Sequence, residues 1–124
     1  METVKIKLGN REIPLRFTME EFAQIEEAVG NLSTIDELLL KGKNRIRNTQ
    51  KALRIMGNAG LAAAGEKPDL TDKGVMEMMQ PRRLVEYQTA AISAINDGMY
   101  VEANEDEERD LVLEDIERKK ETGN

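Results

Sequence analysis

The sequence contains no cysteine and no histidine among its 124 residues. Without cysteine, the chain can form no disulfide, no thiolate metal site and no thiol nucleophile. Without histidine, it has no Ser–His–Asp triad, no imidazole base and no imidazole-bound metal. These absences exclude the commonest catalytic chemistries. We expect a protein that is not an enzyme, with no cofactor, no metal ligand and no catalytic residue.

Aromatic residues make up only 3% of the chain, whereas 40% is hydrophobic and 34% is charged. The core must therefore be built from Leu, Ile, Val, Ala and Met. No apolar run approaches the roughly 20 residues that cross a bilayer, and the first ten residues lack the apolar segment of a secretory signal. We expect one folded domain in the cytoplasm and no membrane partner.

The net charge of −6 is unevenly distributed along the sequence. The segment from Glu102 to Glu121 holds ten acids and four bases, so it alone accounts for the −6. The remaining residues carry 14 acids and 14 bases. We therefore divide the chain into a neutral body, residues 1–100, and an acidic C-terminal tail, residues 101–124. Such a balance disfavours general nucleic-acid binding.

The N-terminus shows two runs in which apolar and polar residues alternate. The apolar positions of the two runs are Val4, Ile6, Leu8, Ile13, Leu15 and Phe17. This period of two, interrupted by "GNRE" at Gly9–Glu12, predicts a β-hairpin with one buried face. Pro14 has no N–H to donate, so its strand needs an unpaired edge. Two strands alone are marginally stable, so helices or another chain must cover their apolar face.

A helix follows the hairpin without a linker. "TMEE" at Thr18–Glu21 fits a capping box, and Phe17 and Phe22 have the spacing of a hydrophobic staple. Met19, Phe22 and Val29 are predicted to face inward. The acids of this segment, Glu20, Glu21, Glu26 and Glu27, are expected on its solvated side.

Further helical patterns continue to about residue 98. Ser33 is expected to cap a short helix, and a longer helix is expected at about Arg45–Ala64. The inward stripe of the longer helix is Ile46, Thr49, Leu53, Met56, Gly60 and Ala63. Its small-sided second half, "MGNAGLAAAG", allows another helix to approach closely.

Two more helices complete the predicted body. Thr71 is expected to cap a short helix, Pro81 to begin the next one, and "NDG" at Asn96–Gly98 to end it. The predicted fold class is α+β, mostly α. An N-terminal β-hairpin packs on a small bundle of about four to five helices, followed by an acidic tail that is partly helical or disordered.

Two features are candidate partner-binding elements. Met76 in "VMEMMQ" falls off the face that Val75, Met78 and Met79 share, so it is available to contact a client. The tail has helix formers from Glu105 to Lys120 but a thin apolar stripe, consisting of Leu111, Val112, Leu113 and Ile116. That stripe indicates either a solvated tail or a segment that binds a partner. The hairpin edge is a third place for a partner, although Lys5, Lys7 and Pro14 disfavour free strand pairing.

Several short motifs carry little chemistry. The acid pairs lie where an amphipathic helix keeps its solvated face, and almost no aromatics are present to stack a sugar. "EDEE" at Glu105–Glu108 lacks the alternating ligands and turn glycine of a Ca²⁺ loop. "GNAG" at Gly57–Gly60 lacks the following Lys-Ser/Thr of a phosphate loop, so close packing explains it better.

The order of these elements resembles the tail assembly chaperones of long-tailed phages and prophages, especially the small ones of the gene-transfer-agent type. The resemblance covers about residues 4–98. It rests on four stretches: "KIKLGNREIPLRFTMEEFAQIEE" at Lys5–Glu27, "STIDELL" at Ser33–Leu39, "PDLTDKGVMEMM" at Pro68–Met79 and "AAISAINDG" at Ala90–Gly98. The acidic tail lies outside it.

This resemblance implies a non-enzymatic chaperone made in the bacterial host cell and absent from the mature virion. Such proteins bind the tape-measure protein, shield its long hydrophobic helices and help recruit tail-tube subunits. Many also exist in a longer form made by ribosomal frameshifting, and Lys119–Lys120 permits an A-rich slippery codon pair. Apolar helix faces also favour transient self-association.

Two other classes of function remain open. One is another phage or prophage structural or regulatory adaptor protein, which the neighbouring genes would distinguish from a chaperone. The other is a small carboxylate-dependent hydrolase, which requires a cleft with facing acids.

Overall fold

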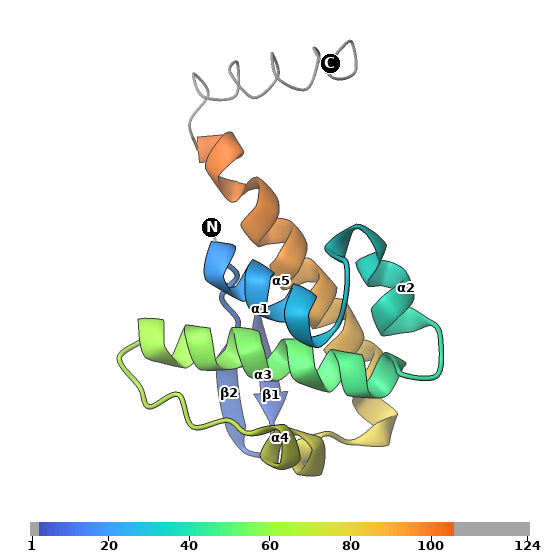
Figure 1. Ribbon diagram of the computed structural model, residues 1–124. Coiled ribbons are helices and arrows are strands. Elements are labelled where there is room, and N and C mark those ends of the chain that lie inside the picture. Colours follow the sequence, from blue (N-terminus) through green and yellow to red (C-terminus); the bar gives the residue numbers. More distant parts are fainter. Residues whose placement is uncertain (1–2, 106–124) are drawn as a thin grey trace.

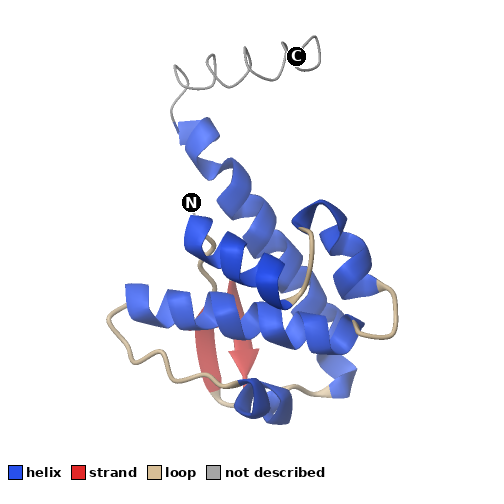
Figure 2. Cartoon of the chain, in the orientation of Figure 1, coloured by secondary structure: helices blue, strands red, loops and turns tan. Residues whose placement is uncertain are grey.

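A computed structural model describes residues 3–105 of the chain, and the side chains of residues 3–99. In this part the structure is a two-stranded hairpin packed on five helices (Figures 1 and 2). The elements are β1 (Lys5–Leu8), β2 (Arg11–Pro14), α1 (Met19–Ala28), α2 (Ile35–Leu40), α3 (Arg45–Ala63), α4 (Asp72–Met78) and α5 (Leu84–Glu105), with 3₁₀ turns η1 (Leu32–Thr34) and η2 (Pro81–Arg83). The predicted fold class is confirmed.

The hairpin is antiparallel and has the predicted buried face. β1 pairs with β2 so that Ile6 lies opposite Ile13, across a two-residue turn at Gly9–Asn10. Gly9 has a φ of 62°, a left-handed value that glycine adopts without strain. The buried side chains of this face are Ile6, Leu8, Ile13 and Leu15, while Lys5 and Lys7 are exposed. Alternation along the strands thus determines which face is covered.

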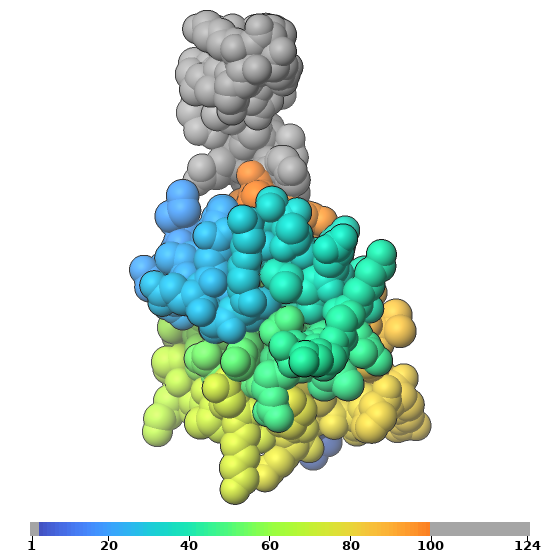
Figure 3. Space-filling model, turned by 45° about the vertical axis from the view of Figure 1, so that its right-hand side comes forward, coloured from blue at the N-terminus to red at the C-terminus, as the bar shows by residue number. Residues whose placement is uncertain are grey.

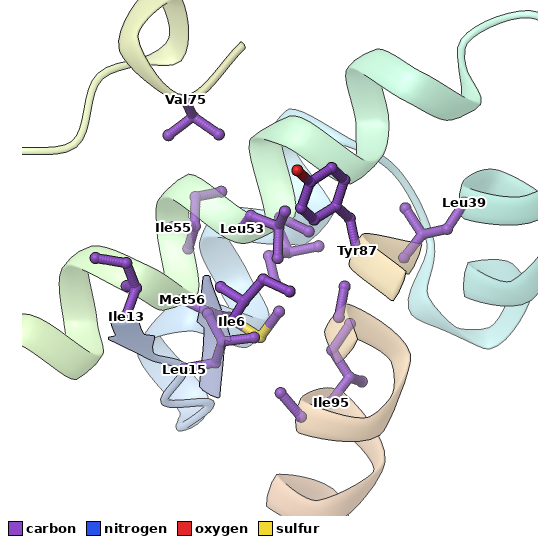
Figure 4. Packing of buried hydrophobic residues seen from close by; sticks show 14 of the residues in the cluster. Ile6, Ile13, Leu15, Leu39, Leu53, Ile55, Met56, Val75, Tyr87 and Ile95 are labelled. Atoms are coloured by element: carbon purple, nitrogen blue, oxygen red, sulfur yellow. The ribbon is translucent and has the colours of Figure 1, made fainter. Parts of the chain in front are cut away.

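Helix α3 is the central element of the fold. It contacts α1, α2, α4, α5 and strand β2, and it crosses in front of the hairpin in the view of Figure 1. Figure 4 shows side chains from the hairpin, α3 and α5 meeting in one core. The predicted stripe is correct in its middle. It is wrong at both ends, because Ile46 and Ala63 are exposed.

The small residues of α3 receive a strand, not the helix that we predicted. A Cβ placed on Gly60 would lie 1.9 Å from the carbonyl oxygen of Pro14. The backbone N–H of Arg16 also donates to the carbonyl of Met56, at 3.1 Å. The main chain that follows β2 therefore lies directly on α3, and glycine at residue 60 is what permits this approach.

Helix α5 is longer than predicted, because "NDG" does not end it. It continues through Gly98 to Glu105 and so crosses residue 100, the expected end of the body. A Cβ on Gly98 would lie 2.6 Å from the carbonyl oxygen of Phe17 and 2.8 Å from its Cβ. Gly98 is thus a contact point between α5 and the hairpin–α1 junction rather than a helix terminator.

The junction between β2 and α1 has the predicted local structure. The Glu21 carboxylate accepts from the Thr18 backbone N–H at 2.8 Å and from the Thr18 hydroxyl. The rings of Phe17 and Phe22 stack with their centroids 5.7 Å apart. Two expectations are wrong: Glu21 is buried by its capping role, and Met19 is 77% exposed because it lies at the open end of α1.

Helix α2 is only six residues long and depends on its neighbours. Asn31, not Ser33, caps the preceding turn, because its Oδ1 accepts from the Ser33 N–H at 2.8 Å. At the other end, the Asn48 side chain donates to the carbonyl of Leu38, and that of Gln88 donates to the carbonyl of Leu39. These bonds tie the last carbonyls of α2 to α3 and α5.

Candidate functional site: an apolar stripe on α5

Helix α5 presents a line of incompletely covered apolar side chains. Val85, Ile92 and Met99 are spaced by seven residues, which is nearly two helical turns, so they lie along one side of the helix. Val85 is 72% exposed, Met99 is 45% exposed and Ile92 is partly buried against the core. We refer to these three residues as the α5 stripe. A seven-residue apolar repeat is the spacing with which one helix packs against another.

The sequence pattern alone does not reveal this stripe. Another side of α5 faces the core and holds five buried or partly buried residues, Leu84, Tyr87, Ala91, Ala94 and Ile95. The helix was predicted to end at Gly98, so Met99 lay outside it. The seven-residue repeat was visible in the sequence, but only a helix that continues past Gly98 connects its members.

The predicted candidate residue Met76 is partly buried on α4 and does not belong to the core cluster. Met78 and Met79 pack against that cluster, as expected for core-filling methionines. The tail candidates Leu111, Val112, Leu113 and Ile116 lie outside the described residues. Of the predicted partner-binding residues, Met76 is therefore the one that the structure describes.

The C-terminal end of the outer edge of β2 packs on helix α3. Pro14 supplies no N–H, its carbonyl oxygen faces Gly60, and the next free donor, the N–H of Arg16, binds Met56 of α3. A strand-addition site could therefore not extend along the end of β2, and the other edge of the hairpin is that of β1. That strand carries the exposed Lys5 and Lys7, which disfavour pairing.

The acids of α1 have structural roles or face solvent. Glu20 accepts from the Gln24 side chain at 2.8 Å, and Glu26 accepts from the Leu32 N–H at 3.1 Å. Among the described residues, no three acidic side chains gather closely enough to hold a metal ion. A hollow of about 380 Å³ between α2 and α3 has a single carboxylate in its lining, that of Glu37, together with Lys41 and Lys43.

The carboxyl group of Asp72 has a pKa below its ordinary value. The Gln50 side-chain amide donates to Asp72 at 2.8 Å, and this bond, together with the Arg54 guanidinium at 2.5 Å, lowers the pKa of the carboxyl. Asp72 begins α4, where Thr71 caps the helix by accepting from the Gly74 N–H. The lowered pKa thus reflects attachment of α4 to α3.

No helix in the described part of the chain is long and apolar enough to cross a membrane. Comparison with models of known protein families, with curated proteins and with solved structures finds no match. The resemblance to tail assembly chaperones therefore rests on the sequence pattern alone.

Proposed function

We propose that this protein is a non-enzymatic tail assembly chaperone of a phage or prophage, acting in the cytoplasm of the bacterial host. It binds the tape-measure protein and helps recruit tail-tube subunits. The observation that carries the proposal is the α5 stripe, together with the order of elements that resembles this family. The stripe offers a client helix an apolar line at the spacing of helix–helix packing.

The chemistry of the stripe matches the client that the resemblance implies. A tape-measure protein consists of long hydrophobic helices, which need an apolar surface while they wait for tube subunits. Val85 is among the most exposed large apolar side chains of the described residues, and Met99 belongs to the same group. Methionine adapts to varied partners, which suits a surface that must release its client.

The test is co-expression with the tape-measure protein encoded beside this gene. The wild-type chain is expected to keep the tape-measure protein soluble. The double variant Val85→Asp with Met99→Asp should lose this ability, because it places two charges on the stripe. The matched control adds the same charges at two exposed alanines of other helices, Ala23→Asp with Ala62→Asp, and should retain it.

Two results would contradict the proposal. If the tape-measure protein precipitates equally with and without this chain, the chaperone function is wrong. If the stripe variant protects as well as the wild type while both variants stay folded, binding occurs on another surface. The neighbouring genes provide an independent check, because a chaperone gene should lie between the tube and tape-measure genes.

A further inference from the structure

The turn between α2 and α3 forms a surface of unpaired positive charge. Residues 38–65 contain six cations and no acid. In the described part of the chain, the ion pairs are made by Arg11, Arg54 and Arg83. Four cations that are close together in the sequence are therefore not paired with any described carboxylate: Lys41, Lys43, Arg45 and Arg47.

Apolar side chains accompany these cations. Leu40 is 45% exposed and Ile46 is 42% exposed, and they lie beside Lys41 and Arg47 in the sequence. We call the six residues Leu40, Lys41, Lys43, Arg45, Ile46 and Arg47 the basic surface. Figure 3 shows this segment, coloured turquoise to green, at the exterior of the molecule. A surface that combines cations with apolar groups suits an acidic segment that also carries apolar side chains.

The chain itself contains such a segment. Residues 106–121, which follow α5, hold eight acids and four bases, a net charge of −4, and include Leu111, Val112, Leu113 and Ile116. We propose that this acidic segment docks on the basic surface of its own molecule. Nucleic acid fits the surface less well, because a phosphate backbone does not use the exposed Leu40 and Ile46, and the chain as a whole is negatively charged.

The lengths are compatible with docking in the same molecule. The Gln88 side chain contacts the Leu39 carbonyl, so α5 passes beside the start of the basic surface. From Gln88 to Glu105 the helix extends about 26 Å at 1.5 Å per residue. The eleven residues from 105 to 116 span about 37 Å when extended, so Ile116 and its acidic neighbours Glu114 and Asp115 can return to residues 40–47. Leu111 lies too close to Glu105 to do so, because six extended residues span only about 20 Å.

The test uses the full chain with a nitroxide label on Thr122→Cys, a single attachment point because the sequence has no cysteine. Backbone amide signals are recorded by NMR at about 0.01 M and about 1 M salt, where charges act over roughly 30 Å and 3 Å respectively. At low salt we expect the label to weaken the amide signals of residues 40–47 severalfold more than the amide signals of residues 62–67. At high salt this difference should disappear.

Charge reversals make the test specific. Lys41→Glu with Lys43→Glu should abolish the weakening. The matched control, Lys67→Glu with Lys73→Glu, gives the same net charge through exposed lysines elsewhere and should preserve it. Adding Glu114→Lys with Asp115→Lys to the first variant should restore it, since the two surfaces have then exchanged charge. Unchanged melting temperatures would establish that all variants fold.

Several outcomes would overturn the proposal. The first is that the label leaves the amide signals of residues 40–47 unweakened in the wild type. The second is that these signals are still weakened in Lys41→Glu with Lys43→Glu, and the third is that the control variant loses the weakening equally. A mixture of isotope-labelled and spin-labelled chains should show no effect, and weakening there would assign the surface to a second copy. An oligonucleotide that shifts the amides of residues 40–47 at physiological salt would assign it to nucleic acid. The proposal does not depend on the chaperone function, so either can fail alone.

Discussion

A methyl group added at Gly60 tests how the hairpin is held against the helices. In the variant Gly60→Ala, the new Cβ would lie 1.9 Å from the carbonyl oxygen of Pro14 and 2.6 Å from its carbonyl carbon. Ordinary contact begins near 3.4 Å, so the strand or the helix must move by about 1.5 Å. The obstacle is main chain, which has no rotamer to change.

The free energy of unfolding should fall, although alanine favours helices. In an open helix, Gly→Ala stabilises by about 1 kcal/mol. Overpacking a buried site lowers the free energy of unfolding by about 1–3 kcal/mol. We expect about 3 kcal/mol at Gly60, because the main chain that it contacts cannot rotate away. The expected net loss is about 2 kcal/mol, which corresponds to a melting temperature lower by about 8 °C.

The measurement is urea unfolding followed by circular dichroism, with Gly57→Ala as the matched control in the same helix. A Cβ at Gly57 would meet side-chain atoms, Leu70 Cδ1 at 2.7 Å and Ile13 Cγ2 at 3.0 Å. Side chains can rotate away, so the control should lose only about 1 kcal/mol. If Gly60→Ala is neutral or stabilising, the close packing of Pro14 on α3 is wrong.

Three further predictions concern local contacts. Phe17→Ala should cost about 1–2 kcal/mol rather than the 3–5 of a fully buried ring, because Phe17 is only partly buried; an unchanged melting temperature would refute the stacking with Phe22. Asp72→Asn should cost about 0.5–1 kcal/mol at neutral pH, since the ion pair is half exposed. The folded pKa of Asp72 lies below 3.8, so its contribution to the free energy of unfolding is present above pH 3.8 and is lost as the pH falls through the folded pKa. A stability difference between the wild type and Asp72→Asn that grows in acid would contradict this assignment. Asn58→Ala should cost about 1–3 kcal/mol by removing both bonds to the Leu70 backbone, at 2.9 and 3.0 Å; hydrogen exchange of the Leu70 amide should accelerate, and an unchanged rate would show that other contacts hold the loop.

The features predicted correctly are those whose partners lie close in the sequence. The turn at Gly9, the Thr18–Glu21 cap and the Phe17–Phe22 stack each involve residues at most five apart. Alternation likewise identified the buried face of the hairpin before any partner was known. Such signals depend on backbone geometry and near neighbours, which a sequence states directly.

The wrong predictions concern residues whose burial or helical state depends on a segment far away in the sequence. Gly98 resembles a helix terminator, yet the approach of Phe17 gives it a packing role in the middle of α5. Met19 and Ile46 fit helical stripes, yet both are exposed in the first turn of their helices. The α5 stripe was missed for the same reason, because it exists only if the helix continues past Gly98.

The sequence by itself determined the kind of fold and the absence of cysteine and histidine chemistry, since period, caps and composition are local properties. The tertiary structure decided which apolar side chains remain uncovered, which glycines mark close contacts and which cations pair with no described carboxylate. Those properties depend on the tertiary contacts of each residue, and these contacts are made by segments far away along the chain.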